Sequence, residues 1–573
     1  MKRCPECRRD YYDDTLLYCL DDGNALLDGP GSGSRASNEP QTAILHTTDA
    51  VGDAPTRAQI HTTQGTAVLR SGGKDIPATN RFDKRLLTIP LLLAIVSLGG
   101  FMGYKYLSAP KQIDSIAVMP FVNESGNPDV EYLSDGMTEM LISSLTKLPN
   151  LNVKSRSSVF RYKGKEPDAR TIGSALNVQS ILNGRVAQRG DQLTLSLELV
   201  DVATDNAIWS QQYSRKQSDL VSLQSEIARD VSSKLQSRLT GADVTKIGSA
   251  STTDPDAYQL YLKGRFQWNK RTGESLKQAV VLFDQAIAKD PNFALAYSGL
   301  AETYVLFANY SVALPKDSMP NAKAAALRAI ELDDSIAEAH VALGMYYADF
   351  AWNQPAAEKE FLRAIELNPN YATAYQQFGI HCLTAMGRFD EAIAQGKRAE
   401  ELDPVSPIIG ADLGNVLMRA KRFDESIAQL NRVLALEPNF WVAYWYLGMA
   451  YDGNQQHREA VAAYRRALST SNDPWVKSLL VRSLAKSGSR NEAVMLFDEL
   501  LSESASRYVS GSSLAVAFAA LGERDKAFAS LEKDFVDRAS RPQLFSVLSI
   551  WDDLRDDPRF AALMQRVERS KLD

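Results

Sequence analysis

A short sequence pattern returns at nearly constant intervals along the second half of the chain. A small residue marks each return, with gaps of 35, 34, 34, 33 and 34 residues between Ala357, Ala392, Ser426, Ala460, Ala493 and Ala527. A second series consists of the glycines Gly344, Gly379, Gly414 and Gly448. This period accommodates one pair of helices joined by a turn. Because such a hairpin cannot bury its apolar face alone, we expect the hairpins to stack into a solenoid that binds another chain rather than catalysing a reaction.

Within each repeat, the spacing of small and ring residues predicts the packed face of the second helix. Ala357, Phe361 and Ala364 follow one another at intervals of four and three residues, which places them on one helical face. Prolines end three successive repeats, at Pro369, Pro404 and Pro438. At these residues the sequence resembles the tetratricopeptide repeat (TPR). The resemblance covers residues 255–535, about eight hairpins, and leaves residues 536–573 as a C-terminal capping segment. Between Tyr304 and Ala322 we expect a longer loop than the family has.

The TPR resemblance also implies where a partner binds. In such arrays the first helix of each hairpin lines a concave groove, and we expect exposed partner-binding side chains there. The candidates are Gln376, Ile380, Asn415, Met418, Trp445 and Met449. Trp441 and Trp445 lie one helical turn apart and, with Tyr444, form an aromatic face of the kind that anchors interfaces. The same spacing also fits packing between repeats, so both interpretations stay open.

A long apolar stretch near residue 90 predicts a membrane span. Residues 86–104 include no charged side chain, and as a helix they extend about 29 Å, the thickness of a bilayer core. We therefore predict one transmembrane helix at 86–107, in contact with membrane lipid. More cations precede the stretch than follow it: Arg70, Lys74, Arg81, Lys84 and Arg85 against Lys105 and Lys111. By the positive-inside rule, the amino terminus is cytoplasmic. In a bacterial inner membrane, everything after about residue 107 is then periplasmic.

Three of the four cysteines cluster near the amino terminus. Cys4 and Cys7 form a C-x2-C pair, and Cys19 with Asp22 supplies a second, incomplete pair. Three thiolates and one carboxylate can bind a tetrahedral zinc ion. Residues 1–27 resemble the short zinc ribbons that begin some bacterial regulatory membrane proteins, which implies structural Zn²⁺; a tip without metal, or a redox-active one, is the alternative. Residues 28–80 are rich in Gly, Ser, Thr, Ala and Pro and have few large apolar side chains, so we expect residues 28–85 to form a flexible linker.

Residues 112–240 alternate strand and helix patterns before a three-stranded meander, which predicts an α/β domain with a mixed sheet. The expected strands are 115–121, 151–154, 180–186, 193–200 and 207–213, and the expected helices are 131–148, 171–176 and 220–239. The runs 116–123, 132–139, 182–184 and 209–213 resemble the domain that joins a membrane span to a TPR array in many bacterial receptors, whose cytoplasmic end is a cyclase, a kinase or a winged-helix domain. Its fold is similar to the amino-terminal domain of TolB. The run Trp551–Phe560 resembles the terminal motif of such arrays.

The sequence argues against a catalytic function and against nucleic-acid binding. Phosphate-binding glycine loops and kinase motifs are absent from the sequence. Asp135 and Glu139 suggest an acid pair, but an aspartate before a helix is usually a cap. Phe160-Arg-Tyr-Lys163 is interpreted as a solvated strand edge, and His340 and Cys382 as core residues. The net charge of −6, with acidic residues around the predicted ribbon, disfavours nucleic acid.

We therefore expect a multidomain chain: a zinc ribbon, one transmembrane helix, a mixed-sheet α/β domain and an all-α TPR superhelix. The predicted function is a non-catalytic membrane scaffold or sensor that binds a protein or peptide in the periplasm. Its zinc ribbon is the predicted contact point in the cytoplasm. The alternatives are a passive envelope assembly factor, and a regulatory relative of cyclase or kinase receptors that acts with a separate enzyme.

Overall fold

The structure, a computed structural model, describes residues 2–3, 10–11, 27–28, 113–148, 151–165, 168–235, 252–310, 312–539 and 541–571. Contacts divide the chain into two units, Met1–Phe101 and Met102–Asp573. In the first unit, β1 (Lys2–Arg3) pairs antiparallel with both β2 (Asp10–Tyr11) and β3 (Leu27–Asp28). The predicted zinc ligands Cys4, Cys7, Cys19 and Asp22 lie outside the described residues. So do the linker after Asp28 and the predicted span at 86–107. Among the helices that are described, none combines the length and the hydropathy needed to cross a bilayer.

The second unit begins with the predicted mixed sheet, which the structure confirms. Its strand order is β6-β4-β7-β8-β9, and β5 also pairs with β7. β4 (Ser115–Val118) runs parallel to β6 (Asn152–Val153) and β7 (Ser180–Arg189), and β5 (Val122–Asn123) is also parallel to β7. β7, β8 (Gln192–Asp201) and β9 (Asn206–Lys216) form an antiparallel meander.

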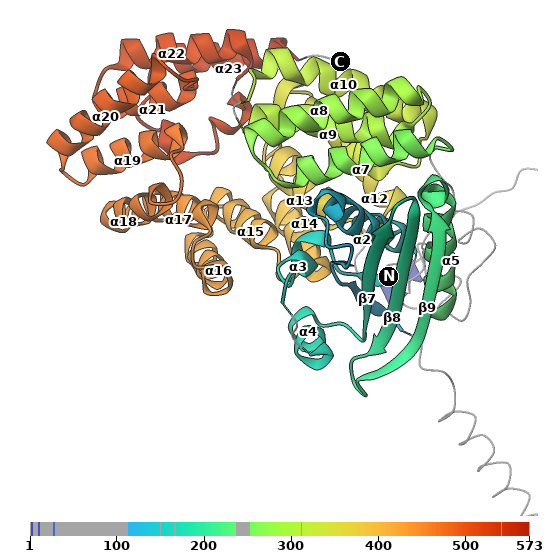
Figure 1. The fold of residues 1–573 in the computed structure, drawn as a ribbon. Coiled ribbons are helices and arrows are strands. Elements are labelled where there is room, and N and C mark those ends of the chain that lie inside the picture. Colours follow the sequence, from blue (N-terminus) through green and yellow to red (C-terminus); the bar gives the residue numbers. More distant parts are fainter. Residues whose placement is uncertain are drawn as a thin grey trace, which may run out of the picture. The chain divides into compact units, whose positions relative to one another are not determined.

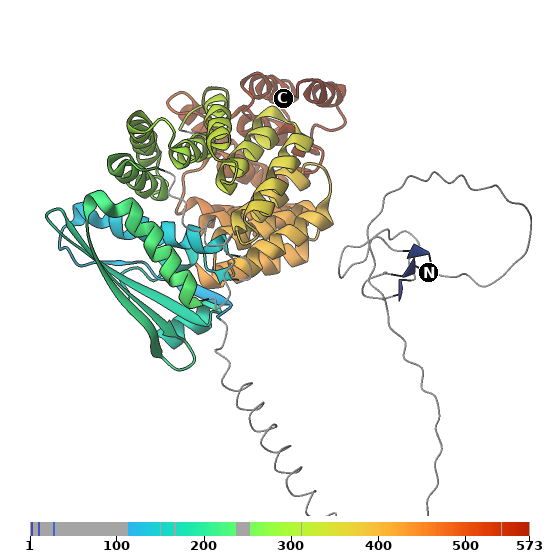
Figure 2. The ribbon, with the colours of Figure 1, turned by 90° about the vertical axis from the view of Figure 1, so that its right-hand side faces the viewer.

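Helices cover one face of this sheet. Along β8 every second side chain is buried, at Leu193, Leu195, Leu197 and Leu199. They share a core with α2 (Glu131–Thr146) and α5 (Leu220–Leu235), and Figure 2 shows α5 as the green helix lying along the strands. Two shorter helices, α3 (Arg156–Phe160) and α4 (Ala169–Leu176), complete the domain, with the 3-10 turns η1 (Pro128–Val130) and η2 (Gln217–Asp219).

Helix α3 corrects one prediction. Phe160-Arg-Tyr-Lys163 is not a strand edge: Phe160 ends α3, and the residues after it form a turn. Ser155 caps the amino terminus of α3 by accepting a hydrogen bond from the Ser158 amide, and the Arg156 guanidinium lies 3.6 Å from the centre of the Phe160 ring. The run of basic and aromatic residues therefore covers the end of a short helix and the turn after it.

Eight helical hairpins follow between Pro255 and Asp537 (Figure 1). The first four are α7 (Pro255–Asn269) with α8 (Gly273–Lys289), α9 (Ala294–Asn309) with α10 (Pro315–Leu332), α11 and η3 (Ala337–Met345, Tyr346–Ala351) with α12 (Gln354–Leu367), and α13 and η4 (Ala372–Gln377, Phe378–Leu383) with α14 (Phe389–Leu402). The last four are α15 (Pro407–Arg419) with α16 (Phe423–Leu436), α17 (Trp441–Gly453) with α18 (His457–Leu468), α19 (Pro474–Lys486) with α20 (Arg490–Ser504), and α21 (Gly511–Ala520) with α22 (Arg524–Asp537). The chain continues through η5 (Pro542–Leu544) and η6 (Ser549–Trp551) to α23 (Pro558–Arg569).

The long loop expected between Tyr304 and Ala322 is wrong. Helix α9 continues to Asn309, and α10 already begins at Pro315. Pro315 occupies the first helical position, where its missing amide hydrogen is not needed. Pro320 lies inside α10, and this second proline is what makes the segment resemble a loop in the sequence.

The glycine series has a more specific role than a general close approach of helices. A Cβ atom at Gly379 would lie 3.0 Å from the carbonyl oxygen of Ala392, a backbone contact. At the other three glycines the nearest atoms belong to a large side chain of the second helix: Phe361 opposite Gly344, Leu430 opposite Gly414, and Tyr464 opposite Gly448. Most of these glycines therefore make room for a side chain, not for a backbone.

Two of the first helices change to π-helical geometry near their glycines: η3 begins two residues after Gly344, and η4 includes Gly379. η3 and η4 are π-helices that continue α11 and α13. Such segments are uncommon and are often found at functional sites. Their carbonyl oxygens accept bonds from side chains outside the helix, as described below for Ala348 and Phe350.

Candidate protein-binding surfaces

The six predicted groove residues lie on the first helices of three consecutive hairpins, as expected, but they are not exposed. Gln376, Ile380, Asn415, Met418 and Met449 are each at most 6% exposed. Trp445 is half-buried and stacks on Trp441, with 5.9 Å between the ring centres. The expectation of exposed side chains on this face is therefore wrong for five of the six residues.

Part of this burial comes from the neighbouring repeat. Gln376 Nε2 donates a hydrogen bond of 2.6 Å to Asp412 Oδ2, and the Tyr446 hydroxyl donates to Asp412 Oδ1 at 3.2 Å. Burial raises the pKa of Asp412, against the opposing effect of the Gln376 hydrogen bond. These bonds join three successive first helices, so they serve packing between repeats.

The end of the chain also packs against these first helices and their π-helical extensions. We call residues 541–554, between α22 and α23, the C-terminal strap (Figure 1, in red). Arg541 Nη1 lies 2.9 Å from His381 Nδ1 and 3.8 Å from Asp349 Oδ1. Gln543 Nε2 donates a hydrogen bond of 2.8 Å to the carbonyl oxygen of Ala348. The strap thus binds both π-helices, η3 and η4.

The middle of the strap is apolar and is buried with the solenoid. Its buried side chains are Leu544, Phe545, Leu548, Ile550, Trp551 and Leu554. They belong to the same hydrophobic cluster as Met418 and Met449. The rings of Phe545 and Trp551 pack with centres 4.4 Å apart. Two of the residues predicted to hold a partner are thus buried in one cluster with the chain's own strap.

The far end of the strap meets basic residues of α19. Arg482 Nη2 donates to the carbonyl oxygen of Ser549 at 3.2 Å, and Lys486 Nζ lies 2.5 Å from Asp553 Oδ1. The covered face therefore has opposite charge at its two ends: Asp349 faces Arg541, and Arg482 with Lys486 faces Asp553. Burial acts to raise the pKa of Asp349, but His381 and Arg541 outweigh it, so this pKa lies below its usual value.

Residues at the carboxyl end of α22, just before the strap, also contact the early repeats. Arg538 Nη1 donates to the carbonyl oxygen of Phe350 at 2.7 Å, and its guanidinium lies 4.3 Å from the centre of the Trp352 ring. Asp537 pairs with Lys316 at the start of α10, at 2.6 Å. The last hairpin therefore closes against α10 and η3.

The α/β domain is attached to the solenoid at the turns that end successive repeats. Asn370 Nδ2 lies within 3.3 Å of the carbonyl oxygens of Thr146, Leu148 and Leu151. One repeat later, the buried Asp403 accepts hydrogen bonds from three serine hydroxyls at the start of α3: Ser155, Ser157 and Ser158. Polar side chains at equivalent turns thus bind two edges of the α/β domain.

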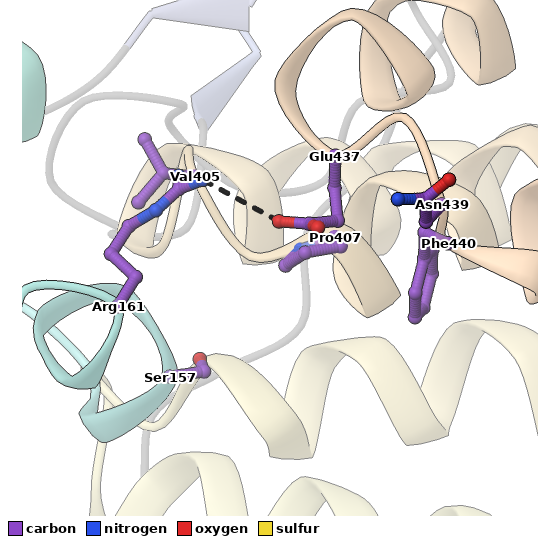
Figure 3. A pocket seen from close by; sticks show the side chains of 7 residues that line it. All are labelled: Ser157, Arg161, Val405, Pro407, Glu437, Asn439 and Phe440. Carbon is purple, nitrogen blue, oxygen red and sulfur yellow. Dashed lines mark ion pairs between the residues drawn. The ribbon is translucent and has the colours of Figure 1, made fainter.

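At the third turn the two parts separate and leave a cavity of about 370 Å³ (Figure 3). Its lining residues are Ser157, Arg161, Val405, Pro407, Glu437, Asn439 and Phe440. Figure 3 shows Arg161 extending from α3 toward Glu437, and their charged atoms are 3.8 Å apart. The cavity is a second hollow surface on the described part of the chain, and the sequence pattern did not indicate it.

A buried ion cluster joins α2 to the first two hairpins. Arg265 Nη2 lies 2.5 Å from Glu139 Oε1, and Arg265 Nη1 lies 3.1 Å from Glu302 Oε1. Burial alone raises the pKa of Glu139, but Arg265 and Arg156 outweigh burial and hold it below its usual value. Asp135 is not a helix cap, since it lies inside α2 and pairs with Lys163 at 2.5 Å. Both carboxylates are thus occupied by cations, and within the described ranges no group of three His, Cys, Asp or Glu residues is arranged to bind a metal ion.

The two remaining core predictions hold. His340 is 4% exposed, with Nδ1 2.7 Å from Glu360 Oε2. Cys382 is fully buried, and burial raises the pKa of its thiol to about 12.

Comparison with known proteins identifies the two folded parts. A profile for the second domain of HilA/YgeH-like transcriptional regulators matches residues 111–230, and a tetratricopeptide-repeat profile matches residues 411–474. The chain is 31% identical to putative adenylate cyclase 3 of Rhizobium meliloti over 232 residues, which are 40% of each protein. It is 34% identical to the transcriptional regulator HilA of Salmonella typhimurium over 90 residues, 16% of each protein. The match thus spans well under half of either relative.

Solved structures with a similar helical part have low sequence identity. A tetratricopeptide repeat protein from Parabacteroides merdae is 14% identical, with a TM-score of 0.35, and the match covers 47% of this chain and 99% of that one. PilF of Pseudomonas aeruginosa is 18% identical, with a TM-score of 0.28, and covers 36% and 91%. With the matching profile and the eight hairpins, the helical part is a TPR solenoid of the kind that binds proteins or peptides.

Proposed function

We propose that this chain is a non-catalytic, single-pass membrane scaffold or sensor. Its TPR solenoid binds a protein or peptide in the periplasm, and its amino-terminal zinc ribbon contacts a partner in the cytoplasm. The apolar stretch at 86–104 is the proposed span in the bacterial inner membrane. The described α/β domain begins a few residues after it, at Ile113.

The observation that carries this proposal is the joint between the α/β domain and the solenoid. Asn370 and Asp403, two residues at the ends of consecutive repeats, bind the domain that follows the proposed span. The Glu139–Arg265–Glu302 cluster adds a third connection at the first hairpins. A ligand that changes the curvature of the solenoid would thus act directly on the domain next to the membrane, as a sensor requires.

Two features support the proposed zinc ribbon at the amino terminus: the short sheet of β1, β2 and β3, and a set of three cysteines and one aspartate that can bind zinc. Cys4 directly follows β1, and Cys19 and Asp22 fall between β2 and β3 in the sequence. Small antiparallel strands next to paired cysteines are what a structural zinc site needs. We propose Cys4, Cys7, Cys19 and Asp22 as the ligands.

The adenylate cyclase relative favours a second candidate function. A chain that is 31% identical to a protein of that name over 232 residues is a candidate regulatory relative that acts with a separate enzyme. In that case the partner at the zinc ribbon is itself a signalling enzyme.

The test is crosslinking in intact cells. A photoreactive residue replaces Met495, which is 62% exposed on α20, and a second replaces Asp14 in the predicted ribbon. We expect Met495 to capture envelope proteins and Asp14 to capture cytoplasmic ones. Capture of cytoplasmic proteins at Met495 would contradict the topology.

Zinc is tested separately on the purified full-length chain. Elemental analysis should find one zinc per chain, and Cys7→Ser should remove it, whereas the control Cys382→Ser should not. Wild-type protein that contains no zinc after purification from zinc-supplemented cells would contradict the site.

A further inference from the structure

The contact between the strap and the solenoid leaves polar atoms unsatisfied on both sides. On the solenoid side, two such atoms of the described residues lie near the end of the chain: Trp352 Nε1, just after η3, and Arg419 Nε on α15, which lies close enough to Arg541 to be affected by its charge. On the strap, Gln543 Oε1, Trp551 Nε1 and Asp553 Oδ2 have no hydrogen-bond partner among the described residues. Arg482 Nε and Nη1, which face Asp553 and Asp452, also lack a hydrogen-bond partner.

Buried polar atoms without partners are expensive, and folded proteins contain few of them. On the strap, Gln543 Oε1 and Trp551 Nε1 are such atoms, although the apolar residues between them are well packed. At the joint between the domains, Asp403 and Asn370 are by contrast each bonded to several groups. The strap therefore covers the first helices with less complete polar pairing than these two joint residues have.

We propose that the strap occupies, in cis, the groove in which the solenoid binds its partner, and that the partner is a peptide of the same chemistry. This deepens the proposed function and rests on it. The strap closes the groove in the free protein and leaves it when a peptide with better polar pairing takes its place.

The groove itself defines the peptide. At one end, Asp349 and the carbonyl oxygen of Ala348 receive a guanidinium and an amide. In the middle the contact is apolar, and the hydrophobic cluster that includes the strap's buried side chains also includes Met418 and Met449, whose unbranched thioether side chains fit varied shapes. At the other end, Arg482 and Lys486 receive a carboxylate. The partner segment thus carries a basic residue, then leucine-like and aromatic residues, then an acidic residue, in the order of the strap.

The test uses the full-length chain and a fluorescein-labelled peptide with the sequence of residues 541–554. The opened variant combines Arg541→Ser, Gln543→Ser and Asp553→Lys, which remove these three side-chain contacts of the strap with the solenoid and leave its apolar residues and the groove unchanged. The matched control is Asp552→Lys, which makes the same charge change at the adjacent residue; Asp552 pairs only locally, with Arg555 at 2.7 Å. Fluorescence anisotropy measures the affinity, and hydrogen exchange measures the opening of residues 541–554.

We expect the opened variant to bind the peptide at least about tenfold more tightly than the wild type or the control, which is about 1.4 kcal/mol. A peptide with lysine in place of its Asp553 equivalent should lose that affinity, because Lys486 and Arg482 then face a cation. An opened variant that melts like the wild type but binds the peptide no better would overturn the inference.

If the triple variant does not fold, the single variant Asp553→Lys is used, because it changes only the charged end of the strap. It should increase peptide affinity in the same direction, and no increase would count against the inference. Partner capture at Met495 is independent of this result. If Met495 still captures a partner but the opened variant binds the peptide no better than the wild type, the proposed function stands and the cis-occupied groove is ruled out.

Discussion

At the scale of single residues, one repeat position performs different tasks in consecutive repeats. Asp403 and Glu437 both lie at the turn that ends a repeat, 34 residues apart. Asp403 is 1% exposed and accepts three serine hydroxyls, whereas the side chain of Glu437 is 47% exposed and lies 3.8 Å from Arg161. The difference arises from what packs against each turn. α3 contacts the turn at Asp403 closely, whereas a cavity separates it from the turn at Glu437.

This difference predicts unequal effects of the same substitution. Asp403→Ala leaves three serine hydroxyls without their acceptor and removes the anion next to the buried Lys154, so we expect a loss of about 2–4 kcal/mol in unfolding free energy. Glu437→Ala, the matched control, should change it by less than about 1 kcal/mol. Urea denaturation of both variants measures the difference. Equal losses would mean that the serine contacts contribute nothing.

A buried thiol gives a prediction about pH. Burial is the main reason that the pKa of Cys382 is raised, to about 12, from an ordinary value of 9.0. A thiol that is harder to ionise in the folded state contributes stability that is complete below pH 9 and is lost as the pH rises toward 12. At pH 8 it also remains an unreactive thiol.

We therefore expect iodoacetamide at pH 8 to modify Cys382 much more slowly in the folded chain than in guanidinium chloride. Mass spectrometry of the peptide that contains Cys382 measures its modification separately from the other three cysteines. Similar rates in the two states would show that the thiol is accessible.

At the scale of elements, the glycines on the first helices are explained by individual side chains on the second helices. A Cβ atom at Gly448 would lie 2.4 Å from Tyr464 Cε1, a distance that requires movement of a fully buried ring. At Gly344 the nearest atom, Phe361 Cε1, would be 3.0 Å away. The same consensus position therefore tolerates a methyl group differently in two repeats.

Two opposing contributions to the free energy of unfolding determine the expected effect of each substitution. Alanine improves helix propensity by about 1 kcal/mol over glycine, and overpacking costs about 1–3 kcal/mol. We expect Gly448→Ala to destabilise the chain by about 1–2 kcal/mol and Gly344→Ala to be close to neutral. Thermal melting of the two variants tests the order, and a larger loss for Gly344→Ala would contradict the geometry.

At the scale of the whole described unit, the α/β domain and the solenoid share one continuous hydrophobic core from Ile116 to Leu417, reinforced by the polar joint. Such an arrangement favours one cooperative unfolding transition for these two parts. The joint depends on Asn370 and Asp403, whose partners belong to the other domain.

Removal of both joint residues should uncouple the two parts. We expect calorimetry to show one transition for the wild type across these parts and two for Asn370→Ala with Asp403→Ala. The matched control is Asn439→Ala, which follows the repeat-ending Pro438 as Asn370 follows Pro369, and whose side chain lines the cavity and accepts a bond from Arg466. The control should keep a single transition. Two transitions in the wild type would mean that the domains are not coupled.

Some of the architecture could be predicted from the sequence because it depends on local patterns. The period of about 34 residues, the alternation along β8 and the prolines at the repeat ends report which faces must be buried, so the mixed sheet and the TPR solenoid were predicted correctly. His340 and Cys382 were predicted as core residues for the same reason. The sequence pattern misassigned two segments. The segment that includes Pro320 was predicted as a loop, because prolines are typical of loops, and Phe160–Lys163 was predicted as a strand edge, because basic-aromatic runs are typical of such edges.

The candidate binding residues lie on the first helices of their hairpins, as the sequence predicted, and only the tertiary structure showed that the strap packs against these helices. Met418 and Met449 lie more than 90 positions before the strap, with which they share one hydrophobic cluster. No periodicity within a repeat reports a contact over that distance. The sequence alone determined the hairpins and their inner face, because helical spacing selects which side chains share a face. The covering by the strap, the serine cluster around Asp403 and the cavity beside Glu437 were decided by how distant segments meet, since such contacts depend on the curvature of the stacked repeats.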